Sequence, residues 1–167
     1  PGIFFFIVIE ISKQKYQYAH LENLPKFSLV VPAKDERNVI TRCLTSLLEI
    51  DYPKDKLEII VVNGDSQDDT LQICQEYSRR NPDVIKVISE KTSKGKPAAL
   101  NCAFPYITGE LVGIFDADSV PEKAVLKKAA SYFQNDSIKA LQGSTSCVNA
   151  SQNMLTRTAA MEDKGWF

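Results

Sequence analysis

The sequence predicts an α/β domain built on a mostly parallel β-sheet with helices on both faces. From residue 27 onward, short apolar runs alternate with longer segments whose apolar residues recur at helical spacing. Regular alternation of strand and helix is typical of parallel sheets. The chain has 167 residues, of which 44% are hydrophobic and 25% charged, which is enough for one domain with a proper core.

Strands are expected where apolar and β-branched residues run together and stop at a turn-forming residue. The first run stops at Pro32, and the fourth stops at two carboxylates. The expected strands cover residues 27–32, 57–62, 84–88, 111–115 and 138–142.

Helices are expected where apolar residues recur three and four positions apart. Asn81 and Pro82 should end the second helix, Pro105 should stop the third, and Pro121 suits the beginning of the fourth. The expected helices cover residues 39–48, 71–77, 98–104, 125–133 and 154–164.

Charge and cysteine content exclude several classes of function. The net charge is −1, so no basic excess points to a nucleic-acid partner. His20 is the only histidine and lies in a polar segment, which argues against a serine–histidine triad or a histidine metal site. The four cysteines show no Cys-x-x-Cys spacing and are interpreted as reduced, buried residues.

The beginning of the sequence is strongly apolar. Residues 3–9 are too few to span a bilayer, which needs about 20 residues, and Lys13 and Lys15 follow closely. We therefore expect residues 1–11 to be the end of a transmembrane helix, 12–26 a linker and 27–167 the folded domain on the cytoplasmic side of the cell membrane. The alternative is that the apolar run forms an edge strand or part of the core.

The end of the fourth expected strand is the most informative stretch. An apolar run stops at Asp116-Ala117-Asp118, so two carboxylates should stand at the carboxyl edge of the sheet, where α/β proteins bind ligands. Their mutual repulsion favours a bound cation, and Mg²⁺ prefers oxygen ligands of this kind. The alternative is that one carboxylate caps the next helix and the other is solvated.

Other polar groups follow neighbouring strands and should reach the same edge. Asp35 and Glu36 follow the first strand and Asp65 follows the second, while Lys94 and Lys96 lie in the loop before the third helix. Carboxylates there can accept hydrogen bonds from a base or from ribose hydroxyls, and lysines can contact phosphate oxygens. Alternatively, the lysines are solvated, and the acidic residues only stabilise the first turn of the following helix through the helix dipole. We prefer this alternative for Asp68 and Asp69.

Four motifs, taken in order, resemble those of the family 2 glycosyltransferases, in particular the membrane-associated branch that includes cellulose, chitin and hyaluronan synthases. The motifs are Val30-Val31-Pro32-Ala33-Lys34-Asp35-Glu36, Val62-Asn63-Gly64-Asp65-Ser66-Gln67-Asp68-Asp69-Thr70, Gly95-Lys96-Pro97-Ala98-Ala99-Leu100-Asn101 and Asp116-Ala117-Asp118-Ser119. The resemblance implies the GT-A fold, a nucleoside diphosphate sugar donor, expected to be a UDP-sugar, and Mg²⁺ or Mn²⁺ as cofactor.

The resemblance also assigns roles to individual residues. It implies that Lys96 approaches the donor and that Asp116 and Asp118 form the metal-binding Asp-x-Asp, with Asp118 the expected direct ligand and Asp116 also near the nucleotide. The residues implied to line the nucleoside pocket are Pro32, Ala33, Asp35 and Glu36.

Two departures from the family pattern affect these roles. The family has an aspartate after the second strand that contacts the base, whereas this chain has Asn63-Gly64-Asp65, so the carboxylate is displaced by one position and the role of Asp65 stays open. The family's catalytic base lies in a later motif, and Glu162-Asp163 follows Asp118 too soon to match it. The base is therefore expected beyond Phe167.

For the intact enzyme the resemblance implies inverting transfer of the sugar to a saccharide or lipid acceptor. The 167-residue chain itself is expected to bind the donor without transferring it. The alternative is a nucleotide-sugar-binding module or an inactive remnant. A phosphate-binding P-loop is absent from the sequence.

Overall fold

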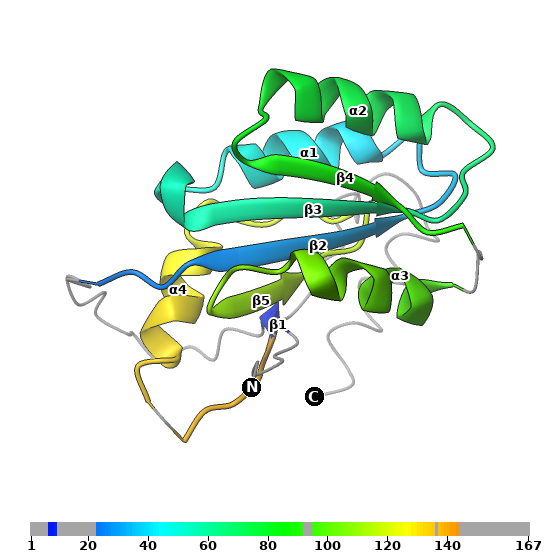
Figure 1. Ribbon diagram of the computed structural model, residues 1–167. Coiled ribbons are helices and arrows are strands. Elements are labelled where there is room, and N and C mark those ends of the chain that lie inside the picture. Colours follow the sequence, from blue (N-terminus) through cyan, green and yellow to red (C-terminus); the bar gives the residue numbers. More distant parts are fainter. Residues whose placement is uncertain (1–6, 10–22, 92–94, 136, 144–167) are drawn as a thin grey trace, which may run out of the picture.

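The computed structural model describes residues 7–9, 23–91, 95–135 and 137–143 (Figure 1). Its centre is a four-stranded, wholly parallel sheet in the order β4-β3-β2-β5. The strands are β2 (Phe27–Ala33), β3 (Leu57–Asn63), β4 (Ile85–Ser89) and β5 (Leu111–Ile114). Four of the five predicted strands are thus confirmed to within a residue at each end.

The central strands β2 and β3 are mostly apolar because both faces of the sheet are covered, and their polar residues, Ser28, Glu58 and Asn63, lie near the strand ends. Alternate residues of β2 enter two different cores: Leu29 and Val31 pack with α1, α2 and α4, while Val30 packs with α3. Since side chains alternate along a strand, a shift of one residue would exchange the two sets. The register is therefore specified from both sides, with Phe27 opposite both Leu57 and Leu111.

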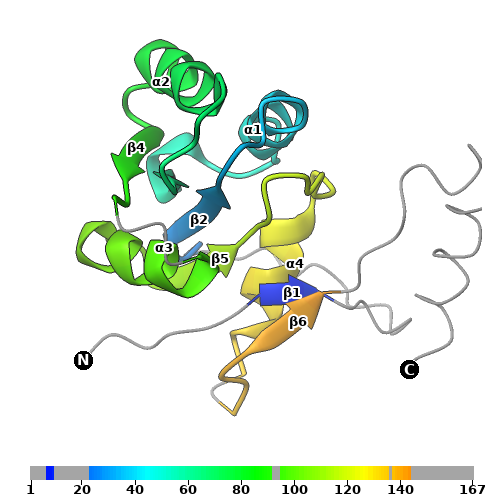
Figure 2. The same cartoon turned by 90° about the vertical axis from the view of Figure 1, so that its right-hand side faces the viewer.

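Helices connect successive strands, as a parallel sheet requires. Figure 2 shows α1 and α2 on one face of the sheet and α3 on the other. The helices are α1 (Ile40–Leu48), α2 (Thr70–Arg80), α3 (Lys96–Ala103) and α4 (Val125–Tyr132), with 3₁₀ turns η1 (Lys54–Lys56) and η2 (Phe104–Tyr106). The four predicted helices that fall in the described part are confirmed, and the one predicted at 154–164 lies outside it.

A second, two-stranded parallel sheet joins β1 (Ile7–Ile9) to β6 (Leu141–Gly143). The strand predicted at 138–142 is therefore wrong at its start, because the N–H of Ile138 donates to the carbonyl of Asn135 and keeps the chain in a turn. Of the segment 1–11, which is predicted to end a transmembrane helix, the structure describes Ile7–Ile9, and these residues form β1. The remainder of 1–11, and its membrane location, stay a prediction.

Among the described residues, no helix combines the length and the apolar character that crossing a membrane requires.

A polar network lies at the amino-terminal ends of the main-sheet strands (the amino edge), opposite the carboxyl-terminal ends (the carboxyl edge), where α/β proteins bind ligands. The buried Ser28 hydroxyl donates to the carboxylate of Glu58 and accepts from the N–H of Gly109 at 2.7 Å. The same Glu58 carboxylate accepts from the N–H of Thr108 at 2.7 Å. These bonds fix the loop before β5 against β2 and β3, and so help to set the register in which β5 pairs with β2.

We predict that Gly109→Ala destabilises the fold. A methyl group at Gly109 would lie 2.6 Å from both the backbone nitrogen and the hydroxyl of Ser28, so the backbone has to shift. Overpacking of this kind costs about 1–3 kcal/mol, measurable by chemical denaturation. The matched control is Gly64→Ala, whose new methyl would lie 3.5 Å from Cβ of Lys34 in ordinary contact and should change stability by less than about 0.5 kcal/mol. Equal effects of the two substitutions would contradict the packing argument.

We also predict that Glu58 makes the fold sensitive to acid. Burial raises the pKa of Glu58, but the hydrogen bonds from Ser28 and Thr108 outweigh it, so that the pKa lies below its ordinary value of 4.5. Because the folded-state pKa is depressed, the ionised form stabilises the fold above the unfolded-state pKa, and this contribution is lost as the pH falls through the folded-state pKa.

Glu58→Gln should therefore lower stability at neutral pH and flatten the dependence of unfolding free energy on pH below about 4.5. The control is Glu76→Gln, on the exposed side of α2. Denaturation curves recorded across the acid range measure both variants, and a pH dependence unchanged in Glu58→Gln would refute the assignment.

Candidate functional site

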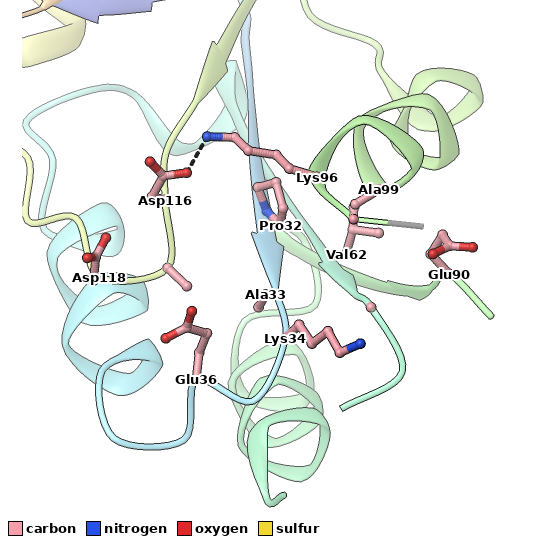
Figure 3. Close-up of a pocket in the computed structure, with 13 residues that line it drawn as sticks. Pro32, Ala33, Lys34, Glu36, Val62, Glu90, Lys96, Ala99, Asp116 and Asp118 are labelled. Atoms are coloured by element: carbon pink, nitrogen blue, oxygen red, sulfur yellow. Dashed lines mark hydrogen bonds and ion pairs between the residues drawn. The ribbon is translucent and has the colours of Figure 1, made fainter. Parts of the chain in front are cut away.

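The candidate site lies at the carboxyl edge of the main sheet, where the chain changes direction. From β2 the chain runs to β3 and β4 on one side, and it returns to β5 on the other side of β2. The strand order therefore reverses between β2 and β5, and the carboxyl ends of strands at such a point are the usual ligand position in open α/β sheets. A pocket of about 340 Å³ occupies this place (Figure 3).

The floor of the pocket is made of small and apolar residues. Pro32 and Ala33 come from the end of β2, Val62 from β3 and Ala99 from the second turn of α3. Gly64, directly after β3, also lines the pocket and places no side chain there. A flat ring can pack on such a surface without displacing side chains.

Three carboxylates gather at one side of this floor. Asp116 and Asp118 follow β5 and Glu36 follows β2, and all three line the pocket. Figure 3 shows them on the same side, opposite Glu90. The two chain segments that carry them are neighbours in the sheet because β2 pairs directly with β5.

The loop that carries Asp116 and Asp118 is anchored through its backbone. The carbonyl of Asp116 accepts from the N–H of Ser119 at 2.9 Å and from the thiol of Cys43 at 3.6 Å. The carbonyl of Asp118 accepts from the guanidinium of Arg42 at 3.3 Å. Because α1 holds the carbonyl groups, both carboxylates stay exposed and available to a ligand.

The electrostatic environment of Glu36 shows the excess of negative charge. Partial burial raises the pKa of Glu36, and the negative charges of Asp118, Asp68, Asp116 and Asp35 raise it further. All of these effects disfavour one more negative charge in the site. A cation bound here would relieve the repulsion.

Lys96 supplies one positive charge from the other side of the pocket. Its ammonium group forms an ion pair with the carboxylate of Asp116. Gly95, with φ of 81°, adopts a left-handed conformation directly before α3, and this turn places Lys96 at the first residue of the helix. Lys94, the other lysine expected here, lies outside the described residues.

The loops after β2 and β3 are interlocked beside the pocket. The carboxylate of Asp35 accepts from the N–H of Gln67 at 2.7 Å, and the N–H of Asp35 donates to the hydroxyl of Ser66 at 3.1 Å. The N–H of Glu36 donates to the hydroxyl of Thr70 at 2.8 Å. These contacts fix Glu36 in the pocket through its backbone.

The structure separates the predicted site residues into two groups. Those that line the pocket are Pro32, Ala33, Glu36, Lys96, Asp116 and Asp118. Asp35 and Asp65 do not line it; both are exposed and adopt left-handed backbone conformations, with φ of 56° and 59°. For a residue other than glycine this conformation is uncommon.

Sequence reasoning missed two charged residues of the pocket, Lys34 and Glu90. Lys34 lies inside the first motif, between residues that were singled out. Glu90 directly follows the last residue of β4, so a comparison of all four strand ends, rather than three, would have found it.

The donor set fits a hard divalent ion that arrives with a substrate. Among the described residues, no three His, Cys, Asp or Glu side chains converge as a ready-made metal site. Mg²⁺ is commonly bound by one or two carboxylates and completes its coordination with water and substrate phosphates. Asp118 and Asp116 match that requirement, with Glu36 nearby to strengthen the negative field.

Comparison with known proteins agrees with this geometry. The family model described as "Glycosyl transferase family 2" matches residues 28–161. The probable glycosyltransferase YdaM of Bacillus subtilis is 37% identical over 147 residues, which cover 86% of this chain and 35% of that protein. The beta-monoglucosyldiacylglycerol synthase of Trichormus variabilis is 31% identical over 170 residues, which cover 99% of this chain and 36% of that protein. The chain thus spans about a third of the length of these relatives.

Solved structures give the same result for the fold. The mannosyltransferase PcManGT from Pyrobaculum calidifontis, in complex with GDP-Man and Mn²⁺, has a TM-score of 0.66 and 33% identity, and the match covers 70% of this chain and 34% of that one. TarS from S. aureus, in complex with UDP-GlcNAc, has a TM-score of 0.59 and 38% identity over 65% of this chain and 31% of that one. The chain belongs to glycosyltransferase family 2, and its parallel sheet with flanking helices is that of the GT-A fold.

Proposed function

We propose that the protein transfers a sugar from a nucleoside diphosphate sugar to a hydroxyl group of a saccharide or lipid, with the help of Mg²⁺ or Mn²⁺. The observation that carries this proposal is the group formed by Asp116, Asp118 and Glu36, which faces Lys96 across the pocket at the switch point of the sheet. The solved relatives with GDP-Man and Mn²⁺ and with UDP-GlcNAc support it.

In this proposal the diphosphate of the donor lies beside the three carboxylates. Asp118, with Asp116, would hold the metal ion, which supplies positive charge to the departing diphosphate. The ammonium group of Lys96 is already at this place and can donate to phosphate oxygens once they arrive. The nucleoside would then extend over the floor formed by Pro32, Val62 and Ala99.

The acceptor hydroxyl needs a general base within hydrogen-bond reach. In the described part of the chain, no carboxylate after Asp118 lines the pocket, and Glu122 is paired with Lys128 at α4. Glu162 and Asp163 lie outside the described residues. We therefore propose that the base comes from a part of the protein other than the described residues.

We predict that nucleotide binding depends on a divalent ion through Asp118. In titration calorimetry, UDP and GDP should bind with Mn²⁺ present and lose at least about tenfold in affinity in excess chelator, because the carboxylates then repel the diphosphate. Asp118→Asn should remove most of this metal dependence.

The control is Asp51→Asn, since Asp51 is an exposed residue that pairs with Lys127. It should leave nucleotide binding unchanged. Equal nucleotide affinity with and without chelator in the unmodified protein would refute the proposed function.

We predict opposite effects of Lys96→Met on the two ligands. Without the ammonium group, Asp116 is free to interact with metal, so Mn²⁺ alone should bind roughly two- to fivefold more tightly. The affinity for UDP or GDP at saturating Mn²⁺ should fall, because a positive charge near the phosphates is lost. Separate titrations with Mn²⁺ and with nucleotide measure the two effects.

The matched control is Lys123→Met, which removes an exposed lysine that pairs with Glu49 and does not line the pocket. It should change neither affinity. A loss of both affinities in Lys96→Met would show that Lys96 does not compete with the metal for Asp116.

A further inference from the structure

The pocket has a second acidic group, away from the three carboxylates that face the diphosphate. The end of β3 does not provide it, because Asp65 is exposed and outside the pocket lining, while Val62 and Gly64 line the pocket there. The neighbouring strand does provide one. Glu90, directly after β4, lines the pocket.

Glu90 is held in a defined position. Its N–H donates to the carbonyl of Asn63 at 2.8 Å, which extends the pairing of β3 and β4 one residue beyond Ser89. Its side chain and backbone are only 8% exposed, and among the described residues it is the one charged residue that counts as buried. Glutamate is seldom buried, and this one lies at the wall of the pocket.

Glu90 lies where the proposed function places the base of a bound nucleotide, at the end of the pocket away from the diphosphate. Figure 3 shows Asp116 and Asp118 on one side of the pocket, Glu90 on the other, and Val62 and Ala99 between them. In the proposed function the diphosphate lies at the aspartates and the nucleoside extends across the apolar floor. The edge of the base would then meet Glu90.

We propose that Glu90 reads the base of the donor by accepting a hydrogen bond from its ring N–H. This inference rests on the proposed function and deepens it. An ionised carboxylate is only an acceptor, and its two oxygens accept several hydrogen bonds, so it can serve a ligand beside its protein contacts. Charge-assisted bonds of this kind are among the strongest in proteins.

The chemistry divides the bases into two classes. Uracil carries a hydrogen on N3 and guanine carries one on N1, and both can donate to Glu90. Cytosine N3 and adenine N1 carry a lone pair instead, which the carboxylate repels, so these bases can offer it only the exocyclic amino group beside that nitrogen. Sites that accept a hydrogen bond from a donor of the substrate discriminate against analogues that lack the donor. Glu90 therefore selects UDP- and GDP-sugars against CDP- and ADP-sugars.

The experiment compares nucleotides at saturating Mn²⁺ by titration calorimetry. The unmodified protein should bind UDP and GDP roughly 10- to 100-fold more tightly than CDP and ADP. UDP methylated at N3 should lose a similar factor, since the methyl group removes the donor. This ligand pair tests the inference without any substitution in the protein.

Glu90→Gln tests the residue, since the amide has nearly the same shape and can donate as well as accept. In this variant the preference for UDP over CDP should fall to a few-fold, and N3-methylation of UDP should reduce the affinity by a smaller factor. The circular dichroism spectrum should be unchanged. The matched control is Asp65→Asn, which changes the other candidate carboxylate and should leave the preference intact.

Two results would overturn the inference: equal binding of UDP and CDP by the unmodified protein, or a preference that survives Glu90→Gln and disappears in Asp65→Asn. Failure of every nucleotide to bind would overturn the proposed function, and this inference with it. Binding of nucleotides without discrimination between bases would overturn the role of Glu90 alone.

Discussion

The pairing of β2 with both β3 and β5 is the constraint on which the site depends. The chain leaves β2 toward β3 and returns to β5 on the other side of β2, so the strand order reverses between β2 and β5, which is the usual ligand position in open α/β sheets. The same pairing brings Glu36 close to Asp116 and Asp118, although about eighty positions separate them in the sequence. The amino edge sets the register, since Ser28, Glu58 and Gly109 fix where β5 begins.

Negative charge is concentrated at the carboxyl edge of the sheet, as the proposed binding of a metal ion with a diphosphate requires. The carboxylates of Asp116 and Asp118 are exposed, while their backbone carbonyls are held by Cys43 and Arg42. The repulsion therefore persists in the free protein and is relieved in part by Lys96. A divalent ion with a diphosphate can replace this partial neutralisation by a stronger one.

Sequence patterns predicted the main sheet and its four helices well, because strands buried on both faces appear as unbroken apolar runs. They did worse where local hydrogen bonds decide the conformation. A turn closed by the carbonyl of Asn135 precedes β6, and Asp35 and Asp65, both with positive φ, do not line the pocket although their motifs follow the correct strands. A motif identifies the end of a strand, but it does not state the direction of the side chain. Glu90 belongs to no motif and was found only from the pocket, and an apolar run as short as that of β1 does not distinguish strand from helix.

The central claim is that the pocket holds a nucleoside diphosphate with a divalent ion at the aspartates. A crystal structure of the protein grown with UDP and Mn²⁺, with anomalous diffraction data, tests it most directly. The account predicts one strong Mn²⁺ peak beside the carboxylates of Asp118 and Asp116, with the diphosphate against it and the base over Val62 toward Glu90. A nucleotide bound elsewhere, or a diphosphate in this pocket with no metal peak at the two aspartates, would contradict it.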